Sequence, residues 1–215
     1  MINRRITCRA GAAALAICAL ASGSAQAYSP PKGTPDLAKM TLQPSDLAPG
    51  ATLLVNTYSD PGGGFHERAE YDRDWGAAST TGGVKLQQLQ TEITLATSAT
   101  WARTIFGQIP SIYNSSGGRG SLIDNVDAGN GSSATLKDAR FGKLRSIGAG
   151  QQSMYGSATI TTKGSTIAAG FAWVRVGPAI ALLVVVSPKA PLADSVTIAI
   201  AKTVAAHMTS VLGAH

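Results

Sequence analysis

The chain has 215 residues, of which 44% are hydrophobic, and this is enough to bury one sizeable core. Its formal charge of +6 includes Arg4, Arg5 and Arg9; without them 15 basic residues face 12 acidic ones, and the net charge is +3. No dense run of Lys and Arg occurs, so we expect no nucleic-acid partner. Both cysteines, Cys8 and Cys18, precede residue 28, so the remainder has no disulfide and no Cys-ligated metal site.

The first 27 residues have the order of a secretory signal peptide. Three arginines precede an uncharged apolar run at 10–21, and small residues with the triplet Ala-Gln-Ala at 25–27 follow. The run is short of the ~20 residues that span a bilayer. We therefore predict cleavage after Ala27 and a secreted or cell-envelope protein, which we expect to be bacterial. An uncleaved anchor is the alternative.

The N-terminal part of the remaining chain predicts a tether and the start of one domain. Residues 28–35 contain three prolines and a glycine, which favour an extended segment. Residues 36–215 show no linker and no repeat, and we interpret them as a single domain. Short helical turns are predicted near residues 36–40 and 45–47, and a strand over 51–58.

Residues 65–75 alternate with period two, which is typical of a strand with two different faces. One face has Phe65, Glu67, Ala69, Tyr71, Arg73 and Trp75; the other has His66, Arg68, Glu70, Asp72 and Asp74. Because Arg68 lies among the acids, we predict a solvated, charge-paired face and no metal site. A hard cation such as calcium on two of these acids is the alternative. A second strand is expected over 84–95.

The middle of the chain changes to helical spacing. Six apolar residues recur at steps of three and four: Ala102, Ile105, Phe106, Ile109, Ile112 and Tyr113. Ser98 is the expected N-cap, and Pro110 is expected to kink or shorten the last turn. We predict a Gly/Ser loop at 115–120, a short strand at 122–126, a loop at 127–133 and a strand at 141–147.

The C-terminal third predicts a β-meander followed by a helix. Runs at 154–162, 166–176 and 179–187 are separated by connections that join only antiparallel neighbours. The run 179–186 is apolar throughout and is too short for a membrane span, so it indicates a strand that is buried on both faces. Residues 191–212 follow with a helical apolar stripe.

These elements predict an α+β domain. We expect an antiparallel β-sheet with a C-terminal meander, packed by a middle and a C-terminal amphipathic helix, with both helices on one face. Three segments, 42–47, 70–73 and 174–177, resemble small exported actinobacterial proteins of uncertain function. The layout is similar to the Mog1/PsbP-like fold. This resemblance implies binding or assembly roles more often than catalysis, and it transfers no catalytic residues.

The predicted ligand-binding residues are aromatic rings with arginines. In 170–176, Phe171, Trp173 and Arg175 share one strand face, and Tyr71, Arg73 and Trp75 extend that surface if the two strands lie in one sheet. Rings and a guanidinium suit an amphipathic small molecule with an anionic head, or an envelope protein. The alternative is that the rings form a second, smaller core while Arg175 reaches outward.

No catalytic set is predicted, and no cofactor. A serine hydrolase needs a nucleophile, an imidazole and a carboxylate, and the nucleophile elbow G-x-S-x-G does not occur. The first hypothesis is therefore an exported, non-catalytic ligand-binding or interaction domain. The alternatives are a secreted hydrolase with an unfamiliar site near His66 and residues 67–74, and an envelope assembly factor without a small ligand.

Overall fold

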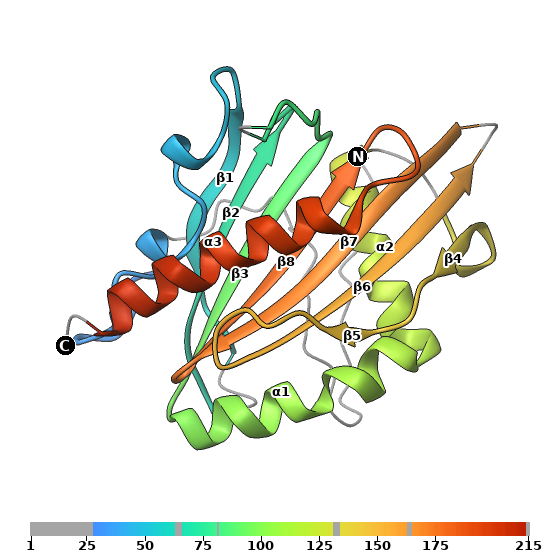
Figure 1. Ribbon diagram of the computed structural model, residues 1–215. Helices are drawn as coiled ribbons and strands as arrows, with labels where there is room; N and C mark the ends of the chain where they lie inside the picture. Colours follow the sequence, from blue (N-terminus) through green and yellow to red (C-terminus); the bar gives the residue numbers. More distant parts are fainter. Residues whose placement is uncertain (1–27, 63–65, 81, 131–133, 163–164, 214–215) are drawn as a thin grey trace, which may run out of the picture.

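The computed structural model describes residues 28–213 apart from 63–65, 81, 131–133 and 163–164. The predicted signal peptide and both cysteines lie outside the described residues. An eight-stranded antiparallel sheet forms the centre, in the order β1-β2-β3-β8-β7-β6-β4, with β5 also paired to β6 (Figure 1). The strands are β1 (Thr52–Ser59), β2 (Glu67–Gly76), β3 (Gln88–Ala96), β4 (Ala139–Phe141), β5 (Arg145–Ser146), β6 (Gln152–Thr162), β7 (Ser165–Val176) and β8 (Ala179–Ser187). The antiparallel α+β prediction and the meander are confirmed.

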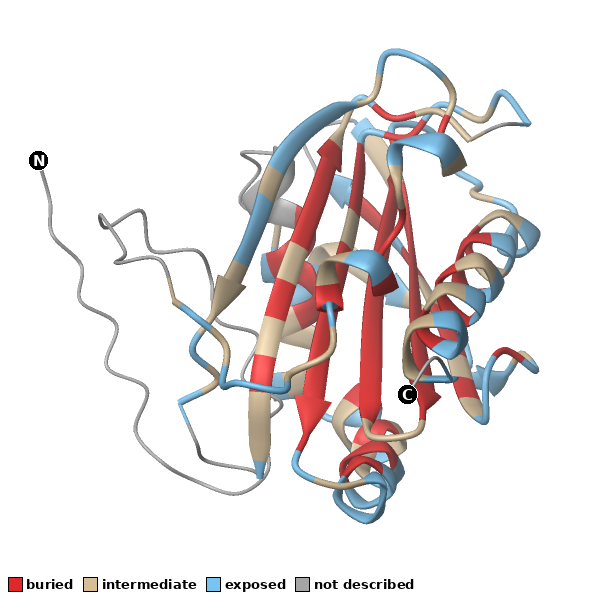
Figure 2. Cartoon of the chain, turned by 90° about the vertical axis from the view of Figure 1, so that its left-hand side faces the viewer, coloured by how far each residue is buried: buried red, intermediate tan, exposed pale blue. Residues whose placement is uncertain are grey.

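The helices cover both faces of the sheet, so the prediction of a single covered face is wrong. Helix α3 (Asp194–Gly213) crosses one face, and α1 (Ala99–Asn114) with α2 (Ser116–Asn130) lies on the other (Figure 1). The reason lies in the central strands. Every residue of β8 is buried, and a strand that is apolar on both sides needs a cover on each side. Figure 2 shows these central strands as buried, with edge strand β1 mostly exposed.

The core on the α3 face is the larger of two clusters. The helix places Ile200, Val204 and Met208 against the sheet. Two 3-10 helices, η1 (Leu37–Met40) and η2 (Pro44–Asp46), extend this layer at the predicted turns. By length and composition, α3 is also apolar enough to cross a membrane. One side of the helix, with its six buried residues, packs against the sheet.

The core on the opposite face lies beneath α1 and α2. Ser98 caps α1 as predicted, since its Oγ accepts a hydrogen bond from the N–H of Trp101 at 3.2 Å. The helix continues four residues past Pro110 and places Phe106, Ile109 and Tyr113 in this core. The aromatic residues of β7 belong to the same cluster. The apolar stripe predicted for the middle helix therefore has its partner surface.

Helix α2 replaces the loop predicted at 115–120, the strand at 122–126 and the start of the loop at 127–133. Its mean hydropathy is low and it is rich in glycine, so its intrinsic preference for helix is weak. Tertiary packing decides its structure: Leu122, Ile123 and Val126 have helical spacing and are buried. A Cβ at Gly118 would lie 2.1 Å from the carbonyl oxygen of Ile112, so only glycine allows this approach to α1.

The strand predicted at 141–147 is two short strands. β4 and β5 both pair with β6, and the 3-10 helix η3 (Leu136–Asp138) precedes them. Residues 142–144 separate the two strands, and the Gly142 N–H still donates to the Ser157 carbonyl on β6 at 2.8 Å. This edge of the sheet is therefore irregular.

Candidate functional site

Three of the six predicted binding residues lie inside the core under α1 and α2. Phe171 is 0% exposed and Trp173 is almost fully buried, and both pack in the cluster that includes Tyr113. Arg175 is 5% exposed; its Nε donates to the Gln152 side chain at 2.6 Å and its Nη1 to the Gly177 carbonyl at 3.0 Å. The rings therefore form the second core that the sequence left as the alternative. That alternative also expected the Arg175 side chain to reach outward to solvent, and this part is wrong because the side chain is buried and hydrogen-bonded.

The other three lie on the opposite face of the sheet. Tyr71 and Trp75 are buried in the α3-side core. The Arg73 guanidinium donates to the Tyr71 hydroxyl at 3.1 Å and to the carbonyl of Leu42 at 3.1 Å. It also donates to Asn56 at 2.9 Å, and the Tyr71 hydroxyl contacts the same Asn56 oxygen. This arginine therefore ties β1 and β2 to the N-terminal segment.

The strand register explains why the six residues do not form one surface. Tyr71 pairs with Ile93, Ile93 with Ala181, and Ala181 with Val174. Tyr71 therefore lies on the same face as Val174, and Trp173 faces the other way because side chains alternate along a strand. The expected continuous aromatic–arginine surface does not exist in the structure.

The face with Trp173 changes its chemistry along a single row of paired residues. From β1 to β6 this row reads Thr57, Asp72, Glu92, Leu182, Trp173 and Met154. The row on one side of it includes Glu70, and the row on its other side includes Asp74. The acidic part of the face is therefore built on β2 and β3, next to the apolar core on β8 and β7.

Three carboxylates meet on this acidic part, and we call Glu70, Asp72 and Glu92 the carboxylate cluster. One oxygen from each side chain lies within 4.8 Å of the others. Asp72 and Glu92 are direct cross-strand partners, which brings their side chains together on one face. Glu92 is 8% exposed because its other neighbour in the row is Leu182, at the border of the core.

The carboxylate cluster has one polar partner and no positive one in the described part of the chain. The Ser59 hydroxyl lies 3.2 Å from Glu70 Oε1 and 3.3 Å from Asp72 Oδ2, but its single proton serves one carboxylate at a time. Glu92 makes no hydrogen bond and no ion pair with any described residue. Arg68 donates instead to the Lys32 carbonyl at 2.9 Å. The predicted charge pairing with Arg68 is therefore wrong.

Burial and mutual repulsion shift the pKa values of all three carboxyls upward. Burial, with the charge of Asp72 as the second cause, raises the pKa of Glu70 to about 7. Burial raises the pKa of Asp72 to about 6, against a smaller lowering by Ser59. The pKa of Glu92 is raised well above its ordinary value by burial and then by the charges of Glu70 and Asp72. No positive group counteracts these shifts.

Polar groups continue beyond the carboxylate cluster along the same face. Asp74 is 7% exposed, and its buried Oδ1 has no hydrogen-bond partner within the described residues. Burial, followed by the charge of Asp72, raises the pKa of Asp74 to about 7. Farther along β3, Gln88 donates from Nε2 to the carbonyl of Asn125 on α2 at 3.3 Å. The polar part of this sheet face thus extends to the α2 helix.

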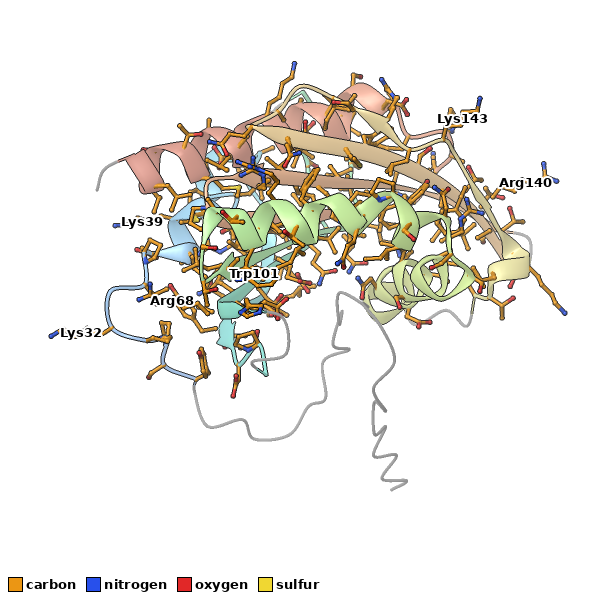
Figure 3. The ribbon with its side chains drawn as sticks, turned by 90° about the horizontal axis from the view of Figure 1, so that it is seen from below. Lys32, Lys39, Arg68, Trp101, Arg140 and Lys143 are labelled. Atoms are coloured by element: carbon orange, nitrogen blue, oxygen red, sulfur yellow. The ribbon has the colours of Figure 1, made fainter. Side chains whose placement is uncertain are left out.

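His66, the candidate base of the hydrolase hypothesis, directly precedes β2. Its ring stacks on Trp101 of α1 with centroids 3.7 Å apart, and Figure 3 shows Trp101 on the side of α1 next to the strands. No hydrogen bond joins this imidazole to a carboxylate among the described residues. His207 is engaged elsewhere, 2.9 Å from the Thr41 carbonyl and 3.6 Å from Asp46. This arrangement does not form a nucleophile–base pair.

Four of the cationic side chains lie at the rim of the molecule. In Figure 3 the side chains of Lys32, Lys39, Arg140 and Lys143 point outward at its two ends. The Lys–Asp and Arg–Asp ion pairs of the described part, Lys39 with Asp36 and Arg145 with Asp194, also lie away from the cluster in the fold. These cationic side chains therefore do not compensate the charge of the carboxylate cluster.

A cleft of about 640 Å³ lies at another place, where the β7–β8 turn meets the start of α1 and the end of α3. Its lining includes Arg68, Leu95, Val176, Pro178 and Leu212. None of the six predicted binding residues and none of the carboxylate cluster lines it.

Comparisons with known proteins give little further information. No protein-family model matches the chain, and no curated protein matches it. Among solved structures, the chain shows a weak similarity to the extracellular domain of PknH from Mycobacterium tuberculosis. The two are 11% identical, the match covers 85% of this chain and 99% of that one, and the TM-score is 0.44. A likeness of this size carries no inference about ligands. The resemblance to a Mog1/PsbP-like layout stays a prediction.

Sequence reasoning missed Glu92 and found its partners. The alternation of residues 65–75 correctly placed Glu70, Asp72 and Asp74 on one face. Glu92 stands in the next predicted strand, and only the pairing of Asp72 with Glu92 brings it to the same place. The signal available in the sequence was that Glu92 is the one charged residue of the segment that forms β3.

Proposed function

We propose that this chain is an exported, non-catalytic binding domain that holds a positively charged group of its ligand with the carboxylate cluster. The observation that carries the proposal is Glu92: it is almost fully buried, lacks a partner among the described residues, and faces the carboxyls of Glu70 and Asp72. The signal-peptide pattern of residues 1–27 supports export.

The carboxylate cluster is expected to bind a cation because unpaired carboxylates that lie close together have a high free energy. Burial disfavours each charge, and each charge disfavours the others. A buried charge is normally compensated by a partner within the protein, and the described residues provide none. Protons relieve the repulsion at low pH, and a cation from outside relieves it near neutral pH. A binding site for a cation is the role that this arrangement supports best.

This proposal moves the binding residues from the rings to the acids. Phe171, Trp173 and Arg175 fill a core, and Tyr71, Arg73 and Trp75 stabilise the other face, so neither set is available to an amphipathic ligand. The stacked ring of His66 gives no support to the hydrolase alternative. An envelope partner remains open within the proposal, provided that it presents a positive group.

Native mass spectrometry of the protein purified from the cells that export it tests the proposal. Three proteins are compared: the wild type, D72N/E92Q, and the control D124N, which removes a charge from an exposed position on α2. We expect a bound cationic species on the wild type and on D124N, and none on D72N/E92Q. Equal occupancy of all three proteins, or no bound species and no response to added cations, overturns the proposal.

A further inference from the structure

We infer that the carboxylate cluster coordinates one hard divalent cation, with Glu70, Asp72 and Glu92 as its protein ligands and Ca²⁺ as the ion to use as a probe. This inference rests on the proposed function and names the class of its ligand. Three observations support it independently of the number of acids: the spacing of the oxygens, the unpartnered buried carboxylate, and the rigidity of the strands that hold them.

The spacing of the oxygens fits a shared ion. Ca²⁺ holds its oxygen ligands at about 2.3–2.6 Å, so two oxygens of one coordination sphere lie at most about 5 Å apart. The three oxygens of the cluster lie within 4.8 Å of one another. The separation of the three oxygens is therefore that of oxygens that coordinate one small divalent ion. A long organic cation would make its contacts over a wider area.

Glu92 is the observation that points to a ligand. A carboxylate that is 8% exposed and has no hydrogen bond among the described residues is costly unless something positive reaches it. One of its carboxylate oxygens lies within 4.8 Å of an oxygen of Glu70 and of an oxygen of Asp72. On the same face, the buried Oδ1 of Asp74 also has no hydrogen-bond partner among the described residues.

The ligands come from rigid, paired strands. Glu70 and Asp72 are alternate residues of β2, and Glu92 is held opposite Asp72 by the β2–β3 pairing. The Ser59 hydroxyl on β1 contacts both β2 carboxyls and limits their movement. A set of ligands that is already in position loses little conformational entropy when the ion binds.

The chemistry of the donors selects the class of metal. All three ligands are carboxylate oxygens, which suit Ca²⁺, Mg²⁺ and Mn²⁺, whereas zinc and copper favour imidazole or thiolate. The imidazole of His66 is stacked on Trp101 and is not part of the cluster. Three carboxylates give up to six oxygens, and water or the Ser59 hydroxyl can complete the sphere.

Isothermal titration calorimetry of the purified, EDTA-treated protein with CaCl₂, and separately with spermidine, tests the inference. For the wild type we expect one Ca²⁺ per chain and a rise in Tm with Ca²⁺. E92Q keeps the shape of the side chain and removes its charge, so it should weaken Ca²⁺ binding at least tenfold while the protein stays folded. The matched control D124N should stay within twofold of the wild type.

The two titrations separate the inference from the proposed function. No Ca²⁺ binding at millimolar concentration, or Ca²⁺ binding that E92Q leaves within twofold, overturns the metal site. If spermidine nevertheless binds and E92Q abolishes that binding, the ligand is an organic cation and the proposed function stands. If neither cation binds, the metal site is wrong, and the proposed function is then limited to a positively charged protein partner, which the native mass spectrometry tests.

Discussion

The two halves of one sheet face make opposite use of the same strand geometry. On β7 and β8, Trp173 and Leu182 point into a core that α1 and α2 cover. One strand farther, in the same row, Glu92 and Asp72 point the same way and carry charge. Neighbouring strands lie about 4.8 Å apart, so Trp173 on β7 and Glu92 on β3, two strands away, are separated by about 10 Å.

From this difference we infer that the apolar half stabilises the fold and that the acidic half is the part available for a ligand. The apolar half has its partners within the chain. The acidic half has raised pKa values and an unpartnered carboxylate, so its free energy is lowered only by protons or by a cation. Four predictions follow from this division, in order of decreasing effect.

Removing an aromatic ring from the apolar half should have the largest effect. Phe171→Ala leaves a cavity in a fully buried position, and we expect the free energy of unfolding to fall by about 3–5 kcal/mol. Urea denaturation measures this change. A loss below about 1 kcal/mol would mean that the rings are not a core, and it would return them to the list of candidate ligand contacts.

In the acidic half, stability of the metal-free protein should fall as pH rises. The unfolded chain releases the protons of Glu70 and Asp72 near pH 4, while the folded chain keeps them until about pH 6–7. Because the folded state then binds more protons, its stability decreases between about pH 4 and 7. For half-buried, interacting groups we expect a decrease on the order of 2 kcal/mol.

Denaturation series in EDTA check this pH dependence. D72N should show a shallower decrease than the wild type and should be more stable at pH 7, whereas D124N should keep the slope of the wild type. A wild type whose stability rises steadily from pH 4 to 7, with D72N parallel to it, would contradict the raised pKa values.

Arg175→Met tests whether the buried arginine stabilises the fold or binds a ligand. The change leaves the acceptors of Gln152 and Gly177 without their donor, and we expect a loss of about 1–3 kcal/mol. Cation binding by the acidic half, measured by calorimetry, should stay unchanged. Weaker cation binding without a loss of stability would reverse this assignment.

The smallest effect is expected where the aromatic contact is exposed. Trp101 is 40% exposed and contacts the ring of His66, so Trp101→Ala should cost only about 0.5–1 kcal/mol. Thermal denaturation measures the difference. A loss as large as that of Phe171→Ala would show that the His66–Trp101 pair is part of the core.

Period and spacing predicted most of the elements, because the burial of a regular strand or helix repeats with its geometry. The meander, the middle helix with its cap at Ser98 and the C-terminal helix are confirmed. Helix α2 was missed because its propensity is weak and its few apolar residues, such as Leu122 and Val126, become informative only when a sheet is there to cover them.

The candidate site divides in the same way. The alternation of β2 determined that Glu70, Asp72 and Asp74 share a face, since successive side chains of a strand point to opposite sides. From the same alternation we predicted that Tyr71 and Arg73 extend the surface of the β7 rings. The strand register instead places them on the opposite face of the sheet.

The sequence by itself determined the α+β class, the antiparallel meander and the composition of each strand face, because these depend on local periodicity. The coverage of both faces by helices, the burial of the rings and the meeting of Glu92 with Glu70 and Asp72, with no counter-ion among the described residues, depend on the tertiary structure. The physical reason is that cross-strand register and the cover above a face depend on contacts between residues far apart in the chain.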